Sequence, residues 1–224
     1  MNAKLVWGLG GLLLLILLLL PFFTHPPLPE REPLFPWRIL ATPSGGIRVF
    51  DIELGVSTLD QARRSLKNDG EVSLFLSSSG IPTVEAYFDR LDLDGLKANL
   101  VLSLAVPEAE ARAMYEAGAR VSTSSGGDKR VSLTQTDLQR IATAYPISGI
   151  TYLPGLDLSP DMIEHRFGAP ARRVREPGSA AEHWLYPQQG LDITLNEKGK
   201  EILQYVHPKD FEVLLRPLSA RGGY

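Results

Sequence analysis

The sequence predicts an α+β fold in which an N-terminal transmembrane helix is followed by tandem small units, each made of one helix and an antiparallel meander of strands. Three observations predict it: an apolar run over residues 5–23, a proline-rich segment over residues 24–38, and a later alternation of strand-like and helix-like segments that occurs twice. We therefore expect six parts: a cytoplasmic N-terminus (1–4), a transmembrane helix (5–23), a spacer (24–38), a first α+β unit with extra helices (39–146), a second α+β unit (147–215) and a flexible tail (216–224).

The apolar run LVWGLGGLLLLILLLLPFF contains no charged side chain. As a helix it would span roughly 28 Å, close to the hydrocarbon thickness of a bilayer. A cleaved signal peptide is the alternative, but it would have a shorter apolar core and a small-residue cleavage site, which the residues after Pro21 do not provide. Lys4 and the terminal amine precede the run, and positive charge stays on the cytoplasmic side. The sequence thus predicts a single-pass protein of the bacterial inner membrane, with a cytoplasmic N-terminus and a periplasmic C-terminal domain.

The segment after the run is expected to be an extended spacer rather than a proline-rich recognition motif. Proline fixes φ and lacks a backbone donor, which disfavours both helix and sheet. The prolines concerned are Pro26, Pro27, Pro29, Pro33 and Pro36.

The amino-acid composition excludes several classes of function. The chain has 23 basic and 26 acidic residues, a net charge of −3, so it offers no global basic field and we expect no nucleic-acid partner. It contains no cysteine, which excludes disulfides, a thiolate nucleophile, thiolate-bound zinc and lipid attachment at a cysteine.

In the first unit, residues 46–54 (GIRVFDIEL) are expected to form one strand, because β-branched and aromatic residues dominate it, and Gly55 ends it. Thr58 can cap a helix that carries Leu59 and Leu66 on one face. Three strand-like segments follow, EVSLFL, TVEAYFDRLDL and LKANLVLSLAV, and turn residues separate them as hairpins require.

Between the two units, a helix is predicted to begin at Pro107 and to end near Gly118, with an alanine-rich face suited to close packing on a sheet. A short strand, RVSLT, follows it. Thr134 with Asp137 three residues later favours the start of another helix, which ends before Pro146.

The last third of the chain repeats this order. The strand GITYL reaches Gly155, Ser159 and Pro160 start a helix, and Gly168 ends it. The strands ARRVRE, EHWLYP and the hairpin LDITLNEKGKEILQYV come next. An internal duplication would explain the repeat, and chance recurrence of glycine-terminated strands is the alternative. The matching landmarks are Gly55 with Gly155, Glu85 with Glu182, and Gly95 with Gly190.

The second unit carries a distinctive order of motifs: Gly155, the segment Phe167 to Pro170, Trp184 with Tyr186, Gly190, and Gly199 with Lys200. In this order, residues 150–206 resemble the SmpA/OmlA (BamE-like) domain family, the fold of the small lipoprotein of the outer-membrane β-barrel assembly machinery. A degenerate second copy is expected over residues 47–106. The resemblance implies tandem BamE-like units and a protein-interaction role. The lipid-bearing cysteine of the family is absent and residues 107–145 lie outside the pattern, so attachment to the outer membrane does not carry over.

Residues able to support catalysis or metal binding form no recognised pattern. Asp161 and His165 stand at i and i+4 on one predicted helix, a spacing that also arises by chance. The serines cluster in turn-like segments, SSSG and SSGG, without the context of a nucleophile elbow, and no phosphate loop or dinucleotide motif is present. We therefore expect no catalytic residue, no cofactor and no metal, and hence no enzyme.

Candidates for contact with a partner are Arg172, Arg173, Arg175, Trp184 and Tyr186. The arginine run is either a solvated strand edge or a contact for anionic lipid, lipopolysaccharide or an acidic partner. The two aromatic side chains share one strand face and would serve as core or contact residues.

The sequence as a whole predicts a membrane-anchored periplasmic adaptor that binds another protein of the cell envelope. The alternative is a periplasmic domain that binds a small ligand or a lipid in a cavity between the meander and the alanine-faced helix.

Overall fold

The structure, a computed structural model, describes residues 32–220 apart from 78–79, 124–128, 177 and 197–198, with the backbone alone at 119–123 and 219–220. Pro33–Tyr224 forms one compact unit, and the description below concerns that unit.

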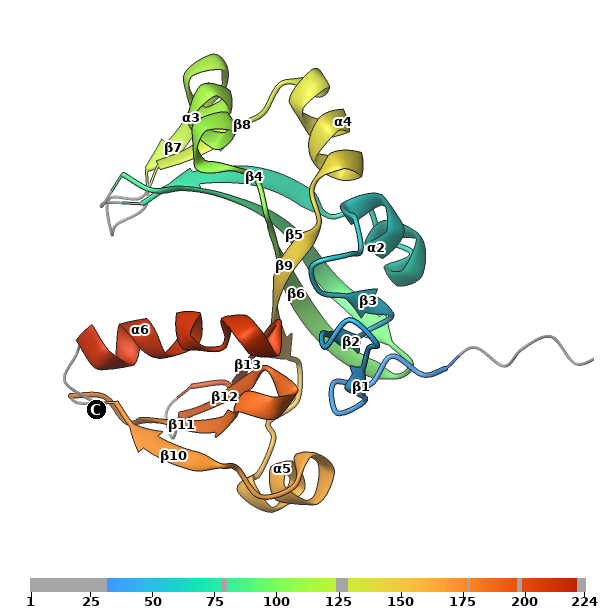
Figure 1. The fold of residues 1–224 in the computed structure, drawn as a ribbon, viewed down its shortest axis with the longest axis vertical. Coiled ribbons are helices and arrows are strands. Elements are labelled where there is room, and N and C mark those ends of the chain that lie inside the picture. Colours follow the sequence, from blue (N-terminus) through green and yellow to red (C-terminus); the bar gives the residue numbers. More distant parts are fainter. Residues whose placement is uncertain (1–31, 78–79, 124–128, 177, 197–198, 221–224) are drawn as a thin grey trace, which may run out of the picture. The chain divides into compact units, whose positions relative to one another are not determined.

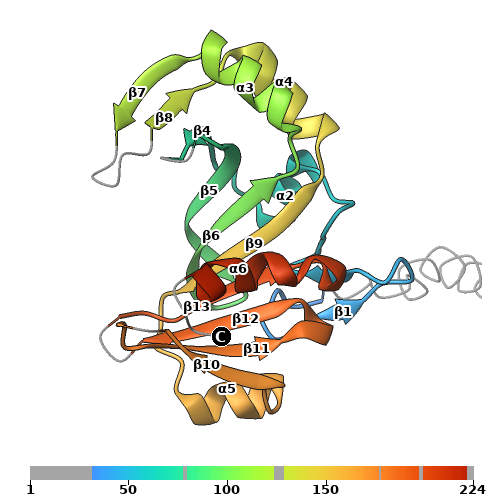
Figure 2. The same ribbon diagram turned by 60° about the vertical axis from the view of Figure 1, so that its left-hand side comes forward.

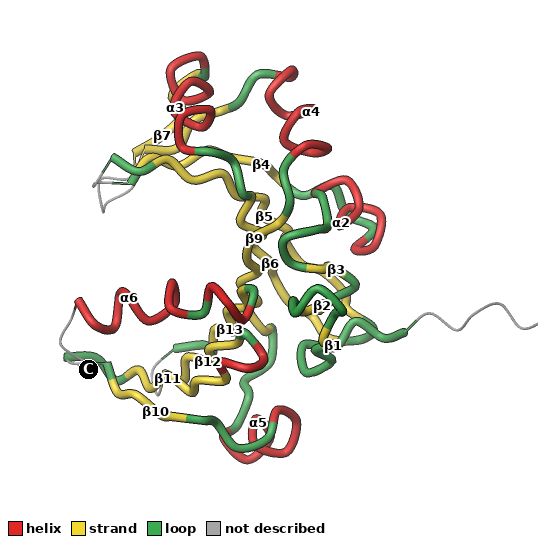
Figure 3. The backbone as a smooth tube through the Cα atoms, in the orientation of Figure 1, coloured by secondary structure: helices red, strands yellow, loops and turns green. Residues whose placement is uncertain are grey.

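Ten strands form one antiparallel sheet in the described part of the chain (Figures 1 and 3). Their spatial order is β10-β11-β12-β13-β9-β6-β5-β4-β8-β7. Their bounds are β4 Glu71–Leu76, β5 Pro82–Leu93, β6 Leu96–Leu104, β7 Ala119–Thr123, β8 Lys129–Ser132, β9 Ile147–Pro154, β10 Arg172–Arg175, β11 Ala181–Tyr186, β12 Leu191–Asn196 and β13 Ile202–Val206. A smaller sheet contains β1 Leu40–Ala41, β2 Ile47–Val49 and β3 Ile52–Glu53.

Helices cover the two faces of the large sheet unevenly (Figures 1 and 2). The face that packs into the main core carries the small sheet together with α2 Leu59–Leu66, α3 Glu108–Ala117, α4 Gln135–Ala144 and α5 Pro160–Phe167. The other face carries α6 Glu212–Ala220, which lies over the β10 to β13 part of the sheet. Two short 3₁₀ helices, η1 Pro187–Gln189 and η2 Pro208–Asp210, complete the connections.

The predicted helix starts at Thr58, Thr134 and Ser159 are confirmed. The hydroxyl of Ser159 accepts a hydrogen bond from the N–H of Met162 at 3.2 Å, and Thr134 accepts one from the N–H of Asp137 at 3.1 Å. Each bond satisfies a backbone donor that the first turn of a helix leaves unpaired. Local capping chemistry therefore fixes where these helices begin.

Strand β9 joins the two halves of the chain. Tyr152 of β9 pairs with Leu100 of β6 on one side and with Leu203 of β13 on the other. The N–H of Gly155, just after β9, donates to the carbonyl of Lys97 at 2.7 Å, an approach so close that a Cβ on Gly155 would lie 2.6 Å from that oxygen.

The predicted fold class of tandem BamE-like units behind a transmembrane helix is wrong. The order of one helix and three strands does occur twice, in α2-β4-β5-β6 and in α5-β10-β11-β12, but the strands belong to one continuous sheet and the protein is mostly β-sheet. Two separate units would leave β6 and β9 as sheet edges with unpaired backbone donors and acceptors. Pairing β6 with β9 satisfies both edges.

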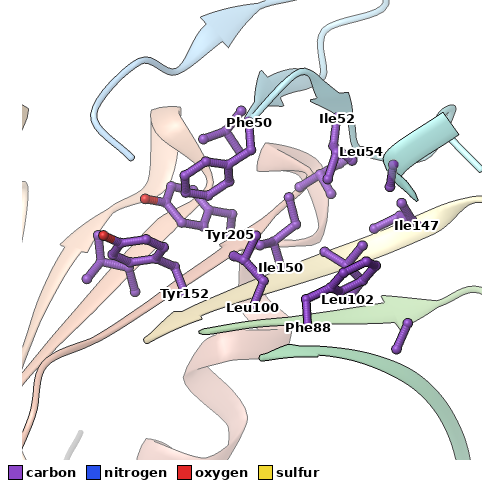
Figure 4. Close-up of a cluster of buried hydrophobic side chains, with 14 of the residues drawn as sticks. Phe50, Ile52, Leu54, Phe88, Leu100, Leu102, Ile147, Ile150, Tyr152 and Tyr205 are labelled. Atoms are coloured by element: carbon purple, nitrogen blue, oxygen red, sulfur yellow. The ribbon is translucent and has the colours of Figure 1, made fainter. Parts of the chain in front are cut away.

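Residues from the start, middle and end of the described chain share the main core (Figure 4). The ring of Phe50 stacks on Tyr152 with centroids 5.4 Å apart and meets the edge of Tyr205 at 6.0 Å. Tyr205 is fully buried, and its hydroxyl donates to the carbonyl oxygen of Pro36 at 2.9 Å. This bond supplies the partner that a buried hydroxyl needs, so the segment before β1 is tied to the last strand of the sheet.

The predicted membrane span needs correction. Among the described residues, no helix is long and apolar enough to cross a membrane. This finding contradicts the transmembrane helix, the single-pass inner-membrane location and the cytoplasmic N-terminus predicted from the sequence. Residues 5–23, on which that prediction rested, lie outside the described residues.

The single strand predicted over residues 46–54 is instead the hairpin β2-β3. Phe50 and Asp51 form its turn with φ of 53° and 61°, the backbone conformation of a tight two-residue hairpin turn. Phenylalanine is unusual at positive φ, but here the conformation directs its ring into the core between Tyr152 and Tyr205.

The predicted flexible tail over 216–224 is also corrected in part, because α6 extends to Ala220. Pro217 lies inside this helix. Phe211, Leu215 and Leu218 recur at helical spacing and pack against Val174 and Leu185. The segment that links β13 to the helix is η2.

We expect Gly190→Ala to destabilise the fold by more than about 2 kcal/mol, because φ is +59° and a Cβ would lie 2.0 Å from the carbonyl oxygen of Val206. Gly95→Ala is the matched control, since Gly95 also has positive φ (+92°) but its Cβ would meet no atom within 4 Å. The free energy of unfolding of this variant should fall only by the conformational penalty of about 1 to 2 kcal/mol. Chemical denaturation measures both, and equal losses would contradict the close approach at Gly190.

Candidate functional site

The two faces of the large sheet differ in how completely they are covered. Side chains alternate between faces along a strand, and residues paired across strands lie on the same face. In β5, β6 and β9 the core-facing residues are buried and every second residue between them is exposed or half-buried. Among the described elements, none covers this second face from β4 to β9, whereas α6 covers it from β10 to β13.

We call the uncovered part the open face. It presents hydroxyl, amide, carboxylate and apolar groups on four adjacent strands. Its members are Glu71, Ser73 and Phe75 on β4, Thr83, Glu85 and Tyr87 on β5, Asn99, Val101 and Ser103 on β6, and Thr151 and Leu153 on β9, with Arg130 of β8 beside Phe75.

The open face continues without a break beneath α6. One cross-strand row runs from Tyr87 through Val101, Thr151 and Gln204 to Asp192 on β12. Tyr87 is 39% exposed, whereas Asp192 at the far end of the row is 1% exposed. The same sheet surface is therefore buried at one end by α6 and accessible at the other.

Glu85 lies at the centre of the open face. Its cross-strand neighbours are Ser73 on β4 and Ser103 on β6, and Thr83 and Tyr87 flank it along β5. In the described part of the chain, no hydrogen bond or ion pair reaches its side chain, and burial raises the pKa of its carboxyl. The nearest ionic contact on this face is that of Arg130, whose guanidinium hydrogen-bonds the hydroxyl of Ser73 at 2.9 Å and binds Glu71.

Glu85 therefore combines partial desolvation with the absence of a charged partner among the described residues. A carboxylate in this state is energetically unfavourable in the isolated protein, and such residues concentrate at functional sites.

A second carboxylate, Asp192, is buried beneath α6. Its Oδ2 lies 2.8 Å from His183 Nδ1, and Thr194 Oγ1 lies 3.2 Å from the same nitrogen. The other carboxylate oxygen, Oδ1, is buried with no hydrogen-bond partner in the described structure, and burial raises the pKa of Asp192 against the opposing effect of His183. In contrast to Glu85, this group is shielded from solvent.

The predicted contact residues Trp184 and Tyr186 lie in the main core. Trp184 is 2% exposed and Tyr186 is 4% exposed. The indole N–H donates to Glu182 Oε2 at 2.9 Å, and the hydroxyl of Tyr186 donates to the carbonyl of Gly168 at 3.0 Å. Burial is the main cause that raises the pKa of Tyr186 to about 12. Both aromatic side chains stabilise the contact between α5 and the sheet and offer little surface to a partner.

The predicted arginine patch is divided between the two faces of β10. Arg173 pairs with Trp184 on the core side, where its guanidinium lies 3.9 Å from the indole centroid and also binds Glu164 of α5. Arg172 pairs with Leu185 and so lies on the α6 side. Arg175 shares the face of Arg173. The structure therefore does not gather the three arginines into one anion-binding surface.

Arg175 lines a surface pocket of about 510 Å³ at the N-terminal end of α5. Glu182 and Glu201 also line it, and Glu201 is 8% exposed and accepts a hydrogen bond from the N–H of Leu158 at 3.1 Å. The pocket mixes one guanidinium with carboxylates and is open to solvent. The cavity expected between the meander and the alanine-faced helix is instead packed, since Ala111 and Met114 of α3 are buried in the core.

The histidines give no metal centre in the described residues, where no group of three or more His, Asp or Glu side chains could hold an ion. Asp161 and His165 both lie on α5, as predicted. His25 lies outside the described residues.

Comparison of the chain with protein-family models, with curated proteins and with solved structures gives no match.

Sequence reasoning missed the open face itself, although part of its signal was present. In the segment TVEAYFDRLDL, period-2 alternation places Thr83, Glu85 and Tyr87 on one strand face. What the alternation does not reveal is that no described element covers this face, while α6 covers the face of β11 and β12 beside it. The pairing of His183 with Asp192 was missed as well, since the two residues come together only across strands.

Trp184→Ala should destabilise the protein by about 3 to 5 kcal/mol, because it removes a large buried side chain and its contact with Arg173. Chemical denaturation provides the measurement. A change below about 1 kcal/mol would contradict the core position and return the indole to the candidate contact residues.

Glu85→Gln should raise the melting temperature at pH 7. The folded-state pKa of Glu85 is raised above the unfolded value of about 4.3, so the folded state retains its proton to higher pH. The stability associated with this group is therefore present below the unfolded pKa and is lost as pH rises through the folded pKa. The advantage of the glutamine variant should shrink as the pH falls toward about 4.

Asp92→Asn is the matched control, for which we expect the opposite change in melting temperature at pH 7. Hydrogen bonds from Lys97 Nζ at 2.6 Å and from the N–H of Gly95 at 2.7 Å lower the pKa of Asp92. Its removal should lower the melting temperature at pH 7 and have less effect in acid. Thermal unfolding of both variants across this pH range measures the effects, and a lower melting temperature for Glu85→Gln at pH 7 would disprove the unfavourable burial of Glu85.

Proposed function

We propose that this chain is a protein-interaction module that acts as an adaptor and docks its partner on the open face. The observation that carries the proposal is the asymmetry of the sheet: the small sheet and α2 to α5 cover one face, while among the described elements only α6 covers the other, over β10 to β13. The uncovered part displays an exposed Tyr87 with half-buried Phe75, Val101 and Leu153.

The composition of the open face supports this reading. Protein interfaces combine an aromatic and aliphatic centre with surrounding polar groups that form hydrogen bonds. On the open face, apolar side chains from β4, β5, β6 and β9 alternate with Thr, Ser, Asn and Glu in a rigid sheet. A rigid surface loses little conformational entropy on binding. As a docking surface, the open face is proposed to have no catalytic role.

The second candidate function, binding of a small ligand or lipid, is favoured by one observation, the pocket of about 510 Å³ beside Arg175 and Glu182. Native mass spectrometry of the purified protein distinguishes the two functions. A small molecule or lipid retained at unit stoichiometry, and lost in Arg175→Ala, would favour this second function.

Photo-crosslinking tests the interaction module directly. A benzoylphenylalanine placed at Tyr87 or at Val101 in cells of the source organism should capture one and the same protein, because both positions lie on the open face. A crosslinker at Val56, a 58% exposed apolar residue between β3 and α2, is the control and should not capture it.

Binding of the captured protein is then reconstituted from purified components. Tyr87→Glu should weaken it by about tenfold or more, since it places a charge at the centre of the interface, whereas Val56→Glu should leave it unchanged. Capture of the same proteins from all three positions, or equal binding by the two glutamate variants, would exclude docking on the open face.

A further inference from the structure

The element that covers the second face inside this protein indicates what kind of element fits the rest of it. Helix α6 lies on the sheet through Leu215 and Leu218, and Phe211, the residue just before the helix, extends the same line at the i, i+4 and i+7 spacing. They pack against Val174 and Leu185, apolar residues set among the polar side chains of β10 to β12. The second face thus accepts an amphipathic helix with a narrow apolar stripe.

The open face repeats this mixture on the adjoining strands. Val101 of β6 and Leu153 of β9 are half-buried apolar residues one cross-strand row apart, and Tyr87 pairs directly with Val101. The row that contains Tyr87 and Val101 is the one that reaches Asp192 under α6. A second helix on the open face would therefore lie on a surface continuous with the one that α6 occupies.

The covered and open parts each have a carboxylate at the centre, and they differ in whether that carboxylate has a hydrogen-bond partner among the described residues. Beneath α6, the buried carboxylate of Asp192 has His183 at 2.8 Å. On the open face, Glu85 is partly desolvated and receives no hydrogen bond or ion pair from the described residues. The guanidinium of Arg130, which bonds to Ser73 beside Glu85, is already in an ion pair with Glu71. The group that would complement Glu85 is therefore a cation that the described residues do not supply.

We infer that the partner docks an amphipathic helix on the open face and places a lysine or arginine side chain of that helix at Glu85. The inference rests on the proposed function and specifies the partner's chemistry. A helix laid over Tyr87, Val101 and Leu153 would exclude water from Glu85, and a cation at that point would form a charge-assisted hydrogen bond with the carboxylate. In the absence of such a cation, docking would bury an unpaired negative charge, so partners without it are rejected.

Two synthetic helical peptides of about four turns test the inference. Both carry leucines at the i, i+4 and i+7 spacing seen in α6, and they differ at one position in the apolar stripe, which is lysine in one peptide and the uncharged isostere norleucine in the other. Titration calorimetry should show the lysine peptide binding the full chain about tenfold or more tightly than the norleucine peptide. Amide shifts on binding should centre on Tyr87, Val101 and Leu153.

Glu85→Gln should abolish the advantage of lysine, while Glu116→Gln, which removes an exposed carboxylate from α3, should preserve it. A melting temperature at or above that of the wild type would show that the Glu85 variant is folded. Equal affinity for the two peptides, no measurable binding of the lysine peptide, or a lysine preference that survives in Glu85→Gln would each overturn the inference.

These outcomes are separable from failure of the proposed function, because crosslinking from Tyr87 and Val101 does not depend on the peptides. If that crosslinking captures its partner while the lysine preference is missing, the docking role stands and only the partner chemistry is wrong. If sedimentation shows self-association that Tyr87→Glu abolishes, the occupant of the open face is a second copy of this chain and the inference fails.

Discussion

The two-sided pairing of β9 is the constraint on which the rest of the architecture depends. Because β9 bonds to β6 on one edge and to β13 on the other, the two strand meanders become one sheet with a shared core. The small sheet, with Phe50 in its hairpin turn, then covers the junction, where Tyr152 and Tyr205 form the opposite wall. Removing this junction would leave two small units, each with an exposed sheet edge and an incomplete core.

A continuous sheet also explains why the protein has a rigid surface to offer. The main core needs only one face of the sheet, and the helices that cover it come from four different segments of the chain. Within the described residues the second face receives one helix, α6, so the strands from β4 to β9 are held in place by packing behind them and by hydrogen bonds on both edges. Glu85 is thereby fixed in a position that disfavours its charge.

Local features of the fold were predictable from the sequence, whereas the way the elements pair was not. Helix starts at Thr58, Thr134 and Ser159 follow from capping side chains that contact residues three positions away. The hairpin at Phe50 was missed because a phenylalanine at positive φ contradicts local preference, and only its distant contacts with Tyr152 and Tyr205 compensate. Helix α6 was not predicted, because the helical spacing of Phe211, Leu215 and Leu218 acquires meaning only against the sheet, and Pro217 weakens the local helix signal.

For the candidate site, too, local features could be predicted from the sequence, whereas the packing of distant elements could not. Alternation along β5 was sufficient to place Glu85 and Tyr87 on one face, but neither alternation nor composition shows which face a helix covers. Trp184 and the neighbouring arginines attracted attention as residue types that interfaces favour, yet Trp184 and Arg173 stack on one another beneath α5. The same chemical properties that suit these residues to an interface also suit them to an internal contact between helix and sheet.

The tie between Tyr205 and Pro36 has a consequence for biosynthesis. The two residues are 169 positions apart, so at typical rates of translation roughly ten to thirty seconds separate their appearance from the ribosome. During that interval the sheet cannot gain β13, and the outer edge of β9 or β6 stands unpaired next to apolar residues that later form the core. A chain of this topology folds late and slowly, since its decisive contacts join distant parts of the sequence. Its nascent form therefore exposes an unpaired strand edge until β13 has left the ribosome.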